Sequence, residues 1–174
     1  MRSQPSPPTV LGVAGNPRPG SRTLGVVQRV GEAVAATLQA RFEGAIDLVE
    51  LSSELFTFGA PGVQAALERT LAADVLVVGS PVYKASYTGV LKAFCDHIAH
   101  GQLAGKPTIP VMVGGSLQHF LALEDHLRPL LIELGGTCPT PGLYVVETEL
   151  DQLDTQLAAY LELVTPALAA LVHA

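Results

Sequence analysis

Three short stretches combine glycines, hydroxyls, basic residues or aromatics in a way that suits ligand binding. They are GNPRPGSRT (15–23), SPVYKASYTG (80–89) and GGS (114–116), called here the first, second and third loops. The chain has only four tyrosines, and two of them, Tyr83 and Tyr87, lie in the second loop beside Lys84. Each loop follows an apolar run, which is where α/β proteins place their ligands.

The first loop suits a phosphate group. It precedes a predicted helix, whose N-terminus offers unpaired N–H groups and a partial positive charge. Ser21 and Thr23 could add hydroxyl donors, and Arg18 or Arg22 could add charge. The loop lacks the Gly-Lys-Ser/Thr of a Walker motif, and its glycine spacing does not fit a dinucleotide fingerprint. The alternative is that Ser21 only caps the helix while the glycines and prolines turn the chain.

Apolar runs and segments of helical periodicity alternate along the chain. The predicted strands cover residues 9–15, 45–51, 74–80, 108–115 and 142–148. The predicted helices cover residues 22–40, 63–73, 88–100, 116–134 and 150–172. Short, nearly all-apolar strands between helices indicate a parallel sheet that is covered on both faces.

We therefore predict a flavodoxin-like α/β fold, a three-layer sandwich around a five-stranded parallel sheet of order 2-1-3-4-5. In this order the loops after strands one, three and four lie at the same edge of the sheet. The first, second and third loops would then border one mouth.

Composition limits the size, partners and compartment of the protein. The 174 residues suit a single domain over 9–174, preceded by a disordered leader at 1–8. Charged residues make up 15% of the chain against an average of about 25%, so leftover apolar surface predicts an oligomer. The net charge of −6 argues against nucleic acid. We find no secretory signal and no run of ~18 apolar residues, and we predict a cytoplasmic protein without a membrane segment.

Two cysteines and two histidines outside the loops do not show the spacing of a metal site. Cys95 and Cys138 belong to no metal-spacing motif and are predicted to be reduced thiols, with Cys95 in the core. His97 and His100 lie three apart on a predicted helix, but they lack a third ligand. We therefore predict no metal site and interpret both histidines as solvated or interface residues.

A proline interrupts the predicted helix 116–134. Pro129 removes one backbone hydrogen bond and its ring clashes with the carbonyl of Asp125. We predict a kink or π-bulge between Glu124 and Pro129, and bulges of this kind gather at functional sites.

The stretches AGNPRPGSRT, SPVYKASYTGVLKAFCD and GGSLQHFLALEDHLRPLL resemble the NADPH-dependent FMN reductases over about residues 9–147. The chain looks most like the flavin-supplying members of two-component monooxygenase systems of the alkanesulfonate type. The resemblance implies a flavodoxin-like fold, FMN as ligand, and NADPH as hydride donor, with NADH also possible. It further implies a homodimer or homotetramer.

The resemblance also implies roles for particular residues. Those expected to hold the FMN phosphate are Asn16, Arg18, Ser21 and Thr23. Those expected to border the isoalloxazine ring are Pro81, Val82, Tyr83 and Lys84, with Gly114, Gly115 and Ser116 at its other edge. Glycines at the third loop would let the backbone approach a flat ring closely.

Some family members have an inserted aromatic or imidazole side chain in the helix after the third loop, at an inter-subunit contact beside the flavin. The ungapped match places Asp125 there, and His126 lies one position further on. We choose His126 as the candidate neighbour of the flavin, alongside Tyr83. His119 also resembles a family position.

The predicted activity is transfer of a hydride from NADPH to FMN, followed by supply of reduced FMN to a partner monooxygenase. Such transfer needs the two rings to be positioned and needs no protein acid or base, so no catalytic side chain is predicted. One alternative is a reductase of quinones or azo dyes that keeps FMN tightly bound. Another is a flavodoxin-like electron carrier. The choice between NADPH and NADH and the roles of Lys84 and Tyr87 stay open.

Overall fold

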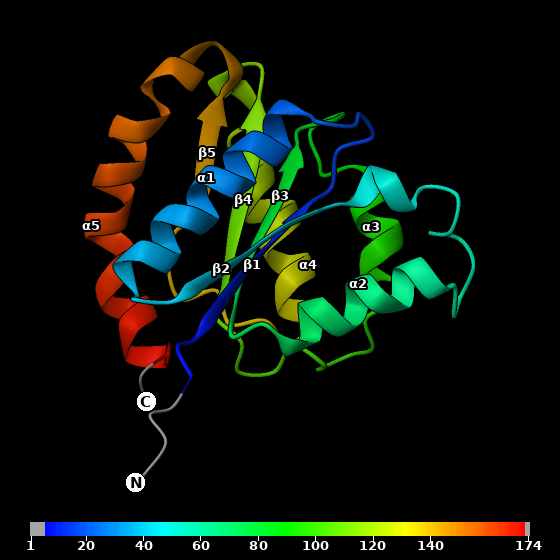
Figure 1. Cartoon of the computed structure of the whole chain (residues 1–174). Coiled ribbons are helices and arrows are strands. Elements are labelled where there is room, and N and C mark those ends of the chain that lie inside the picture. Colours follow the sequence, from blue (N-terminus) through cyan, green and yellow to red (C-terminus); the bar gives the residue numbers. More distant parts are fainter. Residues whose placement is uncertain (1–5, 173–174) are drawn as a thin grey trace, which may run out of the picture.

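The protein forms a central parallel sheet with helices on both faces in the computed structural model, which describes residues 6–172 (Figure 1). The strand order is β2-β1-β3-β4-β5, as the sequence predicted. The strands are β1 (Thr9–Ala14), β2 (Arg41–Asp47), β3 (Val75–Pro81), β4 (Thr108–Gly114) and β5 (Leu143–Val146). The predicted flavodoxin-like, three-layer architecture is therefore confirmed.

Two separate apolar cores hold the helices against the sheet. Helices α1 (Arg22–Thr37) and α5 (Leu153–Val172) cover one face, and α2 (Pro61–Ala72), α3 (Gly89–Cys95) and α4 (Arg128–Glu133) cover the other (Figure 1). Neighbouring residues of a strand point to opposite faces. In β1, for example, Val10 packs in the core beneath α1 and α5, whereas Leu11 packs in the core beneath α2, α3 and α4.

The predicted second strand, 45–51, is wrong at both ends. β2 begins four residues earlier, at Arg41, and Leu48–Leu51 forms a 3-10 helix. This edge strand has exposed polar residues at its start, so it lacks the apolar run of a fully buried strand. Gly44, with φ +85°, lies where the register between β1 and β2 shifts. The resulting bulge lets Phe42 and Ala45 both pack on the core beneath α1.

The helix after the third loop is shorter and more irregular than the predicted 116–134. A 3-10 turn covers Leu117–His119, a π-helix covers Leu123–Leu127, and α4 follows directly. The predicted π-bulge is thus confirmed. Pro129 is the second residue of α4, so its missing N–H group falls at the junction between the π-helix and α4.

The C-terminal helix is more apolar than the sequence analysis recognised. Among the described residues, only the stretch Glu147–Val172 is long and apolar enough to cross a membrane, with a mean hydropathy of 1.4. It comprises a 3-10 turn, Glu147–Gln152, and α5. Leu157, Val164 and Leu168 are buried against the sheet, so α5 packs as a helix of the outer layer.

The predicted leader falls largely outside the described residues, which begin at residue 6. Within the described part of it, the carbonyl of Pro8 accepts a hydrogen bond from Arg41 N at 2.8 Å. This bond joins the residue just before β1 to the start of the edge strand β2.

Candidate active site

The three loops follow β1, β3 and β4, which are neighbouring strands, so they lie at the same edge of the sheet. Backbone hydrogen bonds join them directly. Gly15 N donates to Gly79 O at 2.8 Å, linking the first loop to the end of β3. Val82 N donates to Val113 O at 2.9 Å, linking the second loop to the end of β4. The three loops therefore lie side by side at the carboxyl ends of these strands, as the strand order predicts, and this edge of the sheet is called the mouth below.

Ser21 caps helix α1 at the end of the first loop. Its backbone is extended (φ −68°, ψ 160°), and its Oγ accepts a hydrogen bond from Leu24 N at 3.2 Å. Within residues 6–172, the N–H groups of Arg22 and Thr23 have no protein acceptor, as expected for the first turn of a helix. The capping role of Ser21 is confirmed, and the free N–H groups beside it suit an anion. Contact of Ser21 with FMN phosphate stays a prediction.

Asn16 and Thr23 are buried and hydrogen-bond to each other. Their exposed fractions are 7% and 1%, and Asn16 Nδ2 donates to Thr23 Oγ1 at 3.1 Å. Asn16 Oδ1 also accepts from Arg18 N at 3.0 Å. Both side chains therefore support the first loop from inside, and their predicted contact with phosphate stays a prediction.

An acid that the sequence analysis missed holds the first loop from β2. Asp47 is 8% exposed, and its Oδ2 accepts a hydrogen bond from Gly20 N at 3.1 Å. Gly20 adopts φ +59°, a conformation that favours glycine. Within the described part of the chain, Asp47 Oδ1 has no partner. The available signal was Asp47, one of two acids in the largely apolar run AIDLVEL.

The two arginines of the first loop differ in availability. Arg22 forms an ion pair with Glu147 at 3.1 Å, at the turn that follows β5. Arg18 is exposed and forms no ion pair with any residue in 6–172. Arg18 is therefore the more available cation for a phosphate at the start of α1.

The second loop forms a tight hairpin at the end of β3. Tyr83 and Ser86 exchange backbone hydrogen bonds of 2.8 and 3.0 Å. Lys84 and Ala85 between them both have positive φ values, 51° and 60°, as in a type I′ turn. Residues without the freedom of glycine are strained in this conformation, and such strain clusters at functional sites.

The predicted ring neighbours take different positions within this hairpin. Pro81 is buried as the last residue of β3, and Val82 is half-buried. Tyr83 is 41% exposed and Lys84 is exposed, so both can meet a ligand in the mouth. Tyr87, by contrast, packs against the core beneath α2, α3 and α4.

A tyrosine on the neighbouring strand supports the third loop. Tyr144 on β5 donates from its hydroxyl to Ser116 O at 2.7 Å. A Cβ atom on Gly114 would lie 1.9 Å from that hydroxyl oxygen, so only glycine fits there. A Cβ on Gly115 would meet no atom within 4 Å. Gly114 is thus needed for protein packing, while Gly115 faces open space where a ring could approach.

The segment after the third loop is exposed and apolar. Leu117, Phe120 and Leu121 are 64%, 51% and 53% exposed. His119, Asp125 and His126 are exposed too, and the last two lie on the π-helix. The role of His126 beside the flavin stays a prediction.

An arginine anchors the π-helix to the chain before β5. The Arg128 guanidinium pairs with Glu124 and donates to the carbonyls of Cys138 at 3.0 Å and Thr140 at 2.8 Å. The hydrogen bond from Arg128 lowers the pKa of Glu124 below its usual value of 4.5. The position of the π-helix is therefore set partly by an ion pair.

The remaining histidines and Cys95 have structural partners. Because α3 ends at Cys95, His97 and His100 do not share a helix, which corrects the prediction. His97 Nε2 lies 2.7 Å from Leu55 O, and its ring packs at a 43° tilt against Phe58, with centroids 4.6 Å apart. His100 pairs with Glu133 at 3.4 Å. Cys95 is buried in the core as predicted, and burial raises the pKa of its thiol to about 12.

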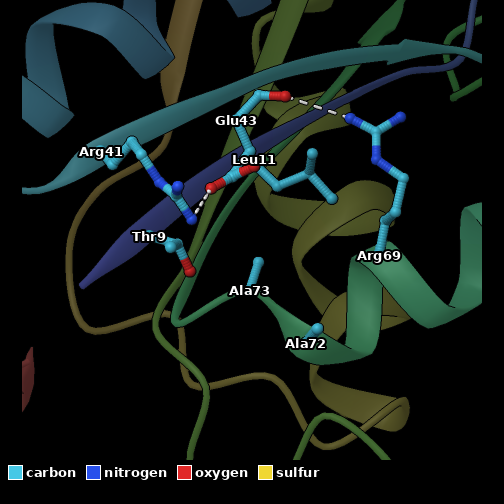
Figure 2. A pocket seen from close by; sticks show the side chains of 7 residues that line it. All are labelled: Thr9, Leu11, Arg41, Glu43, Arg69, Ala72 and Ala73. Carbon is cyan, nitrogen blue, oxygen red and sulfur yellow. Dashed lines mark hydrogen bonds and ion pairs between the residues drawn. The ribbon is translucent and has the colours of Figure 1, made fainter. Parts of the chain in front are cut away.

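A hollow of about 300 Å³ lies at the other end of the sheet, at the amino ends of β1 and β2 (Figure 2). Figure 2 shows its two arginines directed at one residue: Arg41 pairs with the Glu43 carboxylate, and Arg69 donates to the Glu43 carbonyl at 3.1 Å. Arg41 is neutralised by its ion pair, whereas Arg69, among the described residues, meets only a neutral carbonyl and keeps its positive charge. The hollow lies at the opposite end of the strands from the three loops.

The mouth can therefore offer free N–H groups and a cation on one side, with tyrosine and open backbone on the other. That set fits a flat ring that bears a phosphate. A hydride acceptor held there needs only to be positioned against its donor.

Comparison with known proteins agrees with this chemistry. Residues 8–151 match the family model described as NADPH-dependent FMN reductase. The chain is 35% identical over 148 residues to the NADH-dependent FMN reductase SfnF of Pseudomonas putida, covering 82% of this chain and 80% of that protein. It is 31% identical over 141 residues to the FMN reductase (NADPH) of Escherichia coli K12, covering 80% and 74%.

Among solved structures, an apo NADH:FMN oxidoreductase named EMOB is similar, with a TM-score of 0.76 and 30% identity over 89% of both chains. The matched family and its named members give FMN and a nicotinamide nucleotide as ligands. The chain belongs to the NADPH-dependent FMN reductase family.

Proposed function

We propose that this FMN reductase binds FMN across its three loops and releases the reduced flavin to a partner monooxygenase of the alkanesulfonate type. The phosphate lies at the start of α1, and the ring lies between the second and third loops. The observation that supports this placement is the pair of unbonded N–H groups of Arg22 and Thr23 beside the exposed Arg18. We expect the enzyme to act in the cytoplasm.

Each loop has a distinct task in this proposal. FMN, when bound, supplies the ring that accepts the hydride. The first loop binds the phosphate, Tyr83 and Lys84 border the ring, and Gly115 leaves room for its other edge. We keep NADPH as the expected donor, with NADH as the alternative, since relatives with either preference in their names are similar to this chain.

The phosphate assignment is tested by FMN titration of Arg18→Ala and Ser21→Ala. Loss of a charge-assisted hydrogen bond should weaken FMN binding about tenfold in Arg18→Ala. Arg29→Ala is a matched control because Arg29 lies on the same helix, away from the mouth, and pairs with Asp154. Unchanged FMN affinity in both loop variants would refute the assignment.

Release of the flavin is tested by the colour and kinetics of the purified protein. A colourless protein that oxidises NADPH or NADH with added FMN, in stopped-flow and steady-state assays, is expected. A protein that retains FMN and follows ping-pong kinetics with quinones or azo dyes would support the alternative. Absence of turnover with free FMN would overturn the proposed activity.

We also propose a homodimer or homotetramer. The low charge content and the exposed Leu117, Phe120 and Leu121 support an association surface. Light scattering coupled to size exclusion should give a mass of two or four chains, and a monomer at micromolar concentration would contradict the proposal.

A further inference from the structure

Thr88, at the end of the second loop, forms hydrogen bonds with three separate elements. Its hydroxyl donates to the Gly15 carbonyl at 2.6 Å and accepts from Leu91 N at 3.2 Å, at the start of α3. Its backbone N donates to Ser80 Oγ at 3.0 Å, at the end of β3. Thr88 is only 3% exposed, so these bonds are shielded from water.

Ser80 completes this arrangement on the strand side. It is fully buried, and its hydroxyl donates to the Pro81 carbonyl at 2.9 Å while it accepts from Thr88 N. One hydrogen bond, from Thr88 N to Ser80 Oγ, therefore joins the two residues that flank 81–87 and closes the second loop. Both hydroxyl groups have a donor and an acceptor role filled.

Gly15 is held against the same helix. Its missing side chain allows close contact, since a Cβ atom there would lie 2.5 Å from Leu91 Cβ. The first loop thus rests on α3, and the Thr88 hydroxyl bonds to it across 73 residues of sequence. Other capping hydroxyls at the mouth are local: Ser21 and Ser116 bond to N–H groups three and two residues ahead.

We infer that Thr88 is a positioning residue that fixes the distance between the phosphate-binding first loop and the ring-binding second loop. The inference rests on the proposed FMN site. FMN must contact both loops at once. If their spacing is already fixed, binding does not have to order one loop against the other, and the affinity for FMN is higher. The Thr88 hydroxyl need not touch FMN to have this effect.

Comparison of FMN with riboflavin separates this role from simple capping of α3. Riboflavin lacks the phosphate and engages the second and third loops alone. If Thr88 sets the spacing, its loss should reduce the advantage of FMN over riboflavin. If Thr88 only caps α3, its loss should lower stability and leave the ratio of the two dissociation constants unchanged.

The experiment measures dissociation constants for FMN and riboflavin by flavin fluorescence, together with the thermal midpoint, in Thr88→Val and Thr88→Ser. Thr88→Val should weaken FMN binding about tenfold and riboflavin binding less than about twofold. Thr88→Ser retains the hydroxyl and should restore the ratio. Thr70→Val is a matched control, since Thr70 is 2% exposed and donates to Ala66 O on α2, away from the mouth.

An unchanged ratio of the FMN and riboflavin dissociation constants in a folded Thr88→Val protein would overturn the inference, whether both ligands bind normally or both bind equally more weakly. If Thr88→Val does not fold, Thr88→Ala replaces it, because that change removes the same hydroxyl and its bonds to Gly15 O and Leu91 N. A normal ratio in Thr88→Ala would then overturn the inference. Arg18→Ala separates failure of the proposed FMN site from failure of the role of Thr88. If Arg18→Ala binds FMN more weakly but Thr88→Val has a normal ratio, only the role of Thr88 is refuted. If both variants bind FMN normally, the proposed site is refuted.

Discussion

The first and third loops border the same mouth but are held in different ways. The first loop is bonded to three other elements, through Asp47 on β2, Gly79 on β3 and Thr88 beside α3. Within residues 6–172, the third loop has one long-range side-chain hydrogen bond, from Tyr144, and then continues into exposed apolar residues. The comparison indicates that the chain preorganises the first loop, whereas the third loop leads into exposed surface.

The largest difference between the two loops should come from glycine substitutions. Gly15→Ala would force a Cβ to within 2.5 Å of Leu91 Cβ and 3.1 Å of its Cα, so the loop must move away from α3. We expect a loss of about 1–3 kcal/mol in the free energy of unfolding and weaker FMN binding. Urea denaturation gives the first quantity and FMN titration the second.

Gly115→Ala is the corresponding change in the third loop, where a Cβ meets nothing within 4 Å. It should change stability by less than about 0.5 kcal/mol. Equal stability losses in Gly15→Ala and Gly115→Ala would show that the two loops are not held differently.

Tyr144→Phe tests the single side-chain support of the third loop. It removes the hydroxyl that donates to Ser116 O and leaves the ring in place. The expected cost is about 1 kcal/mol, the usual net value of a hydrogen bond. Flavin binding should weaken for FMN and riboflavin alike, because the support lies beside the proposed ring position. A selective effect on FMN would contradict the assignment of the two sides.

Acid should loosen the helix that follows the third loop. The folded-state pKa of Glu124 is lowered by Arg128, so the pair stabilises the fold above the usual value of 4.5. That contribution is lost as the pH falls below 4.5 through the lowered pKa. It should be under about 1 kcal/mol, since Glu124 is partly exposed.

The measurement is the free energy of unfolding from pH 7 to pH 3 for the native chain and Glu124→Gln. The native chain should be the more stable at pH 7, and the difference should shrink as the pH falls below 4.5. A difference that is the same at every pH would assign the effect to something other than the carboxylate charge.

The smallest effect on stability should come from the exposed apolar residues. Phe120→Ser, at a position that is 51% exposed, should change the free energy of unfolding of one chain by less than about 0.5 kcal/mol. Its effect should appear in the molecular mass in solution, which should fall if this segment is part of the association surface. A large loss of stability at low protein concentration would show that the side chain is already packed.

The sheet order and the convergence of three loops could be predicted because they follow from local patterns. Buried parallel strands are apolar runs, and helices alternate with them. The same reliance on apolar runs misplaced β2, whose first residues, Arg41 and Glu43, are polar on an edge strand. The apolar periodicity also predicted one continuous helix before Arg128, where the chain instead forms a 3-10 turn and a π-helix.

The supports of the loops could not be predicted, because they join residues that are distant in sequence. Asp47 bonds to Gly20 across 27 residues, and Tyr144 bonds to Ser116 across 28. Neither belongs to a motif, and an acid or tyrosine at the end of a strand has many possible partners before the fold is known. The loops were therefore predictable from composition, whereas their geometry needed the structure.

The burial of Cys95 bears on how long such an enzyme survives in air. Free reduced flavin reacts with oxygen to give hydrogen peroxide, so a reductase that releases it works in the presence of an oxidant. Peroxide attacks the thiolate, and susceptibility also requires access. Cys95 is 3% exposed and its pKa is raised to about 12, so its sulfur is almost entirely protonated and enclosed at neutral pH. If reduced flavin is released as proposed, Cys95 is thereby protected from the peroxide that the flavin forms.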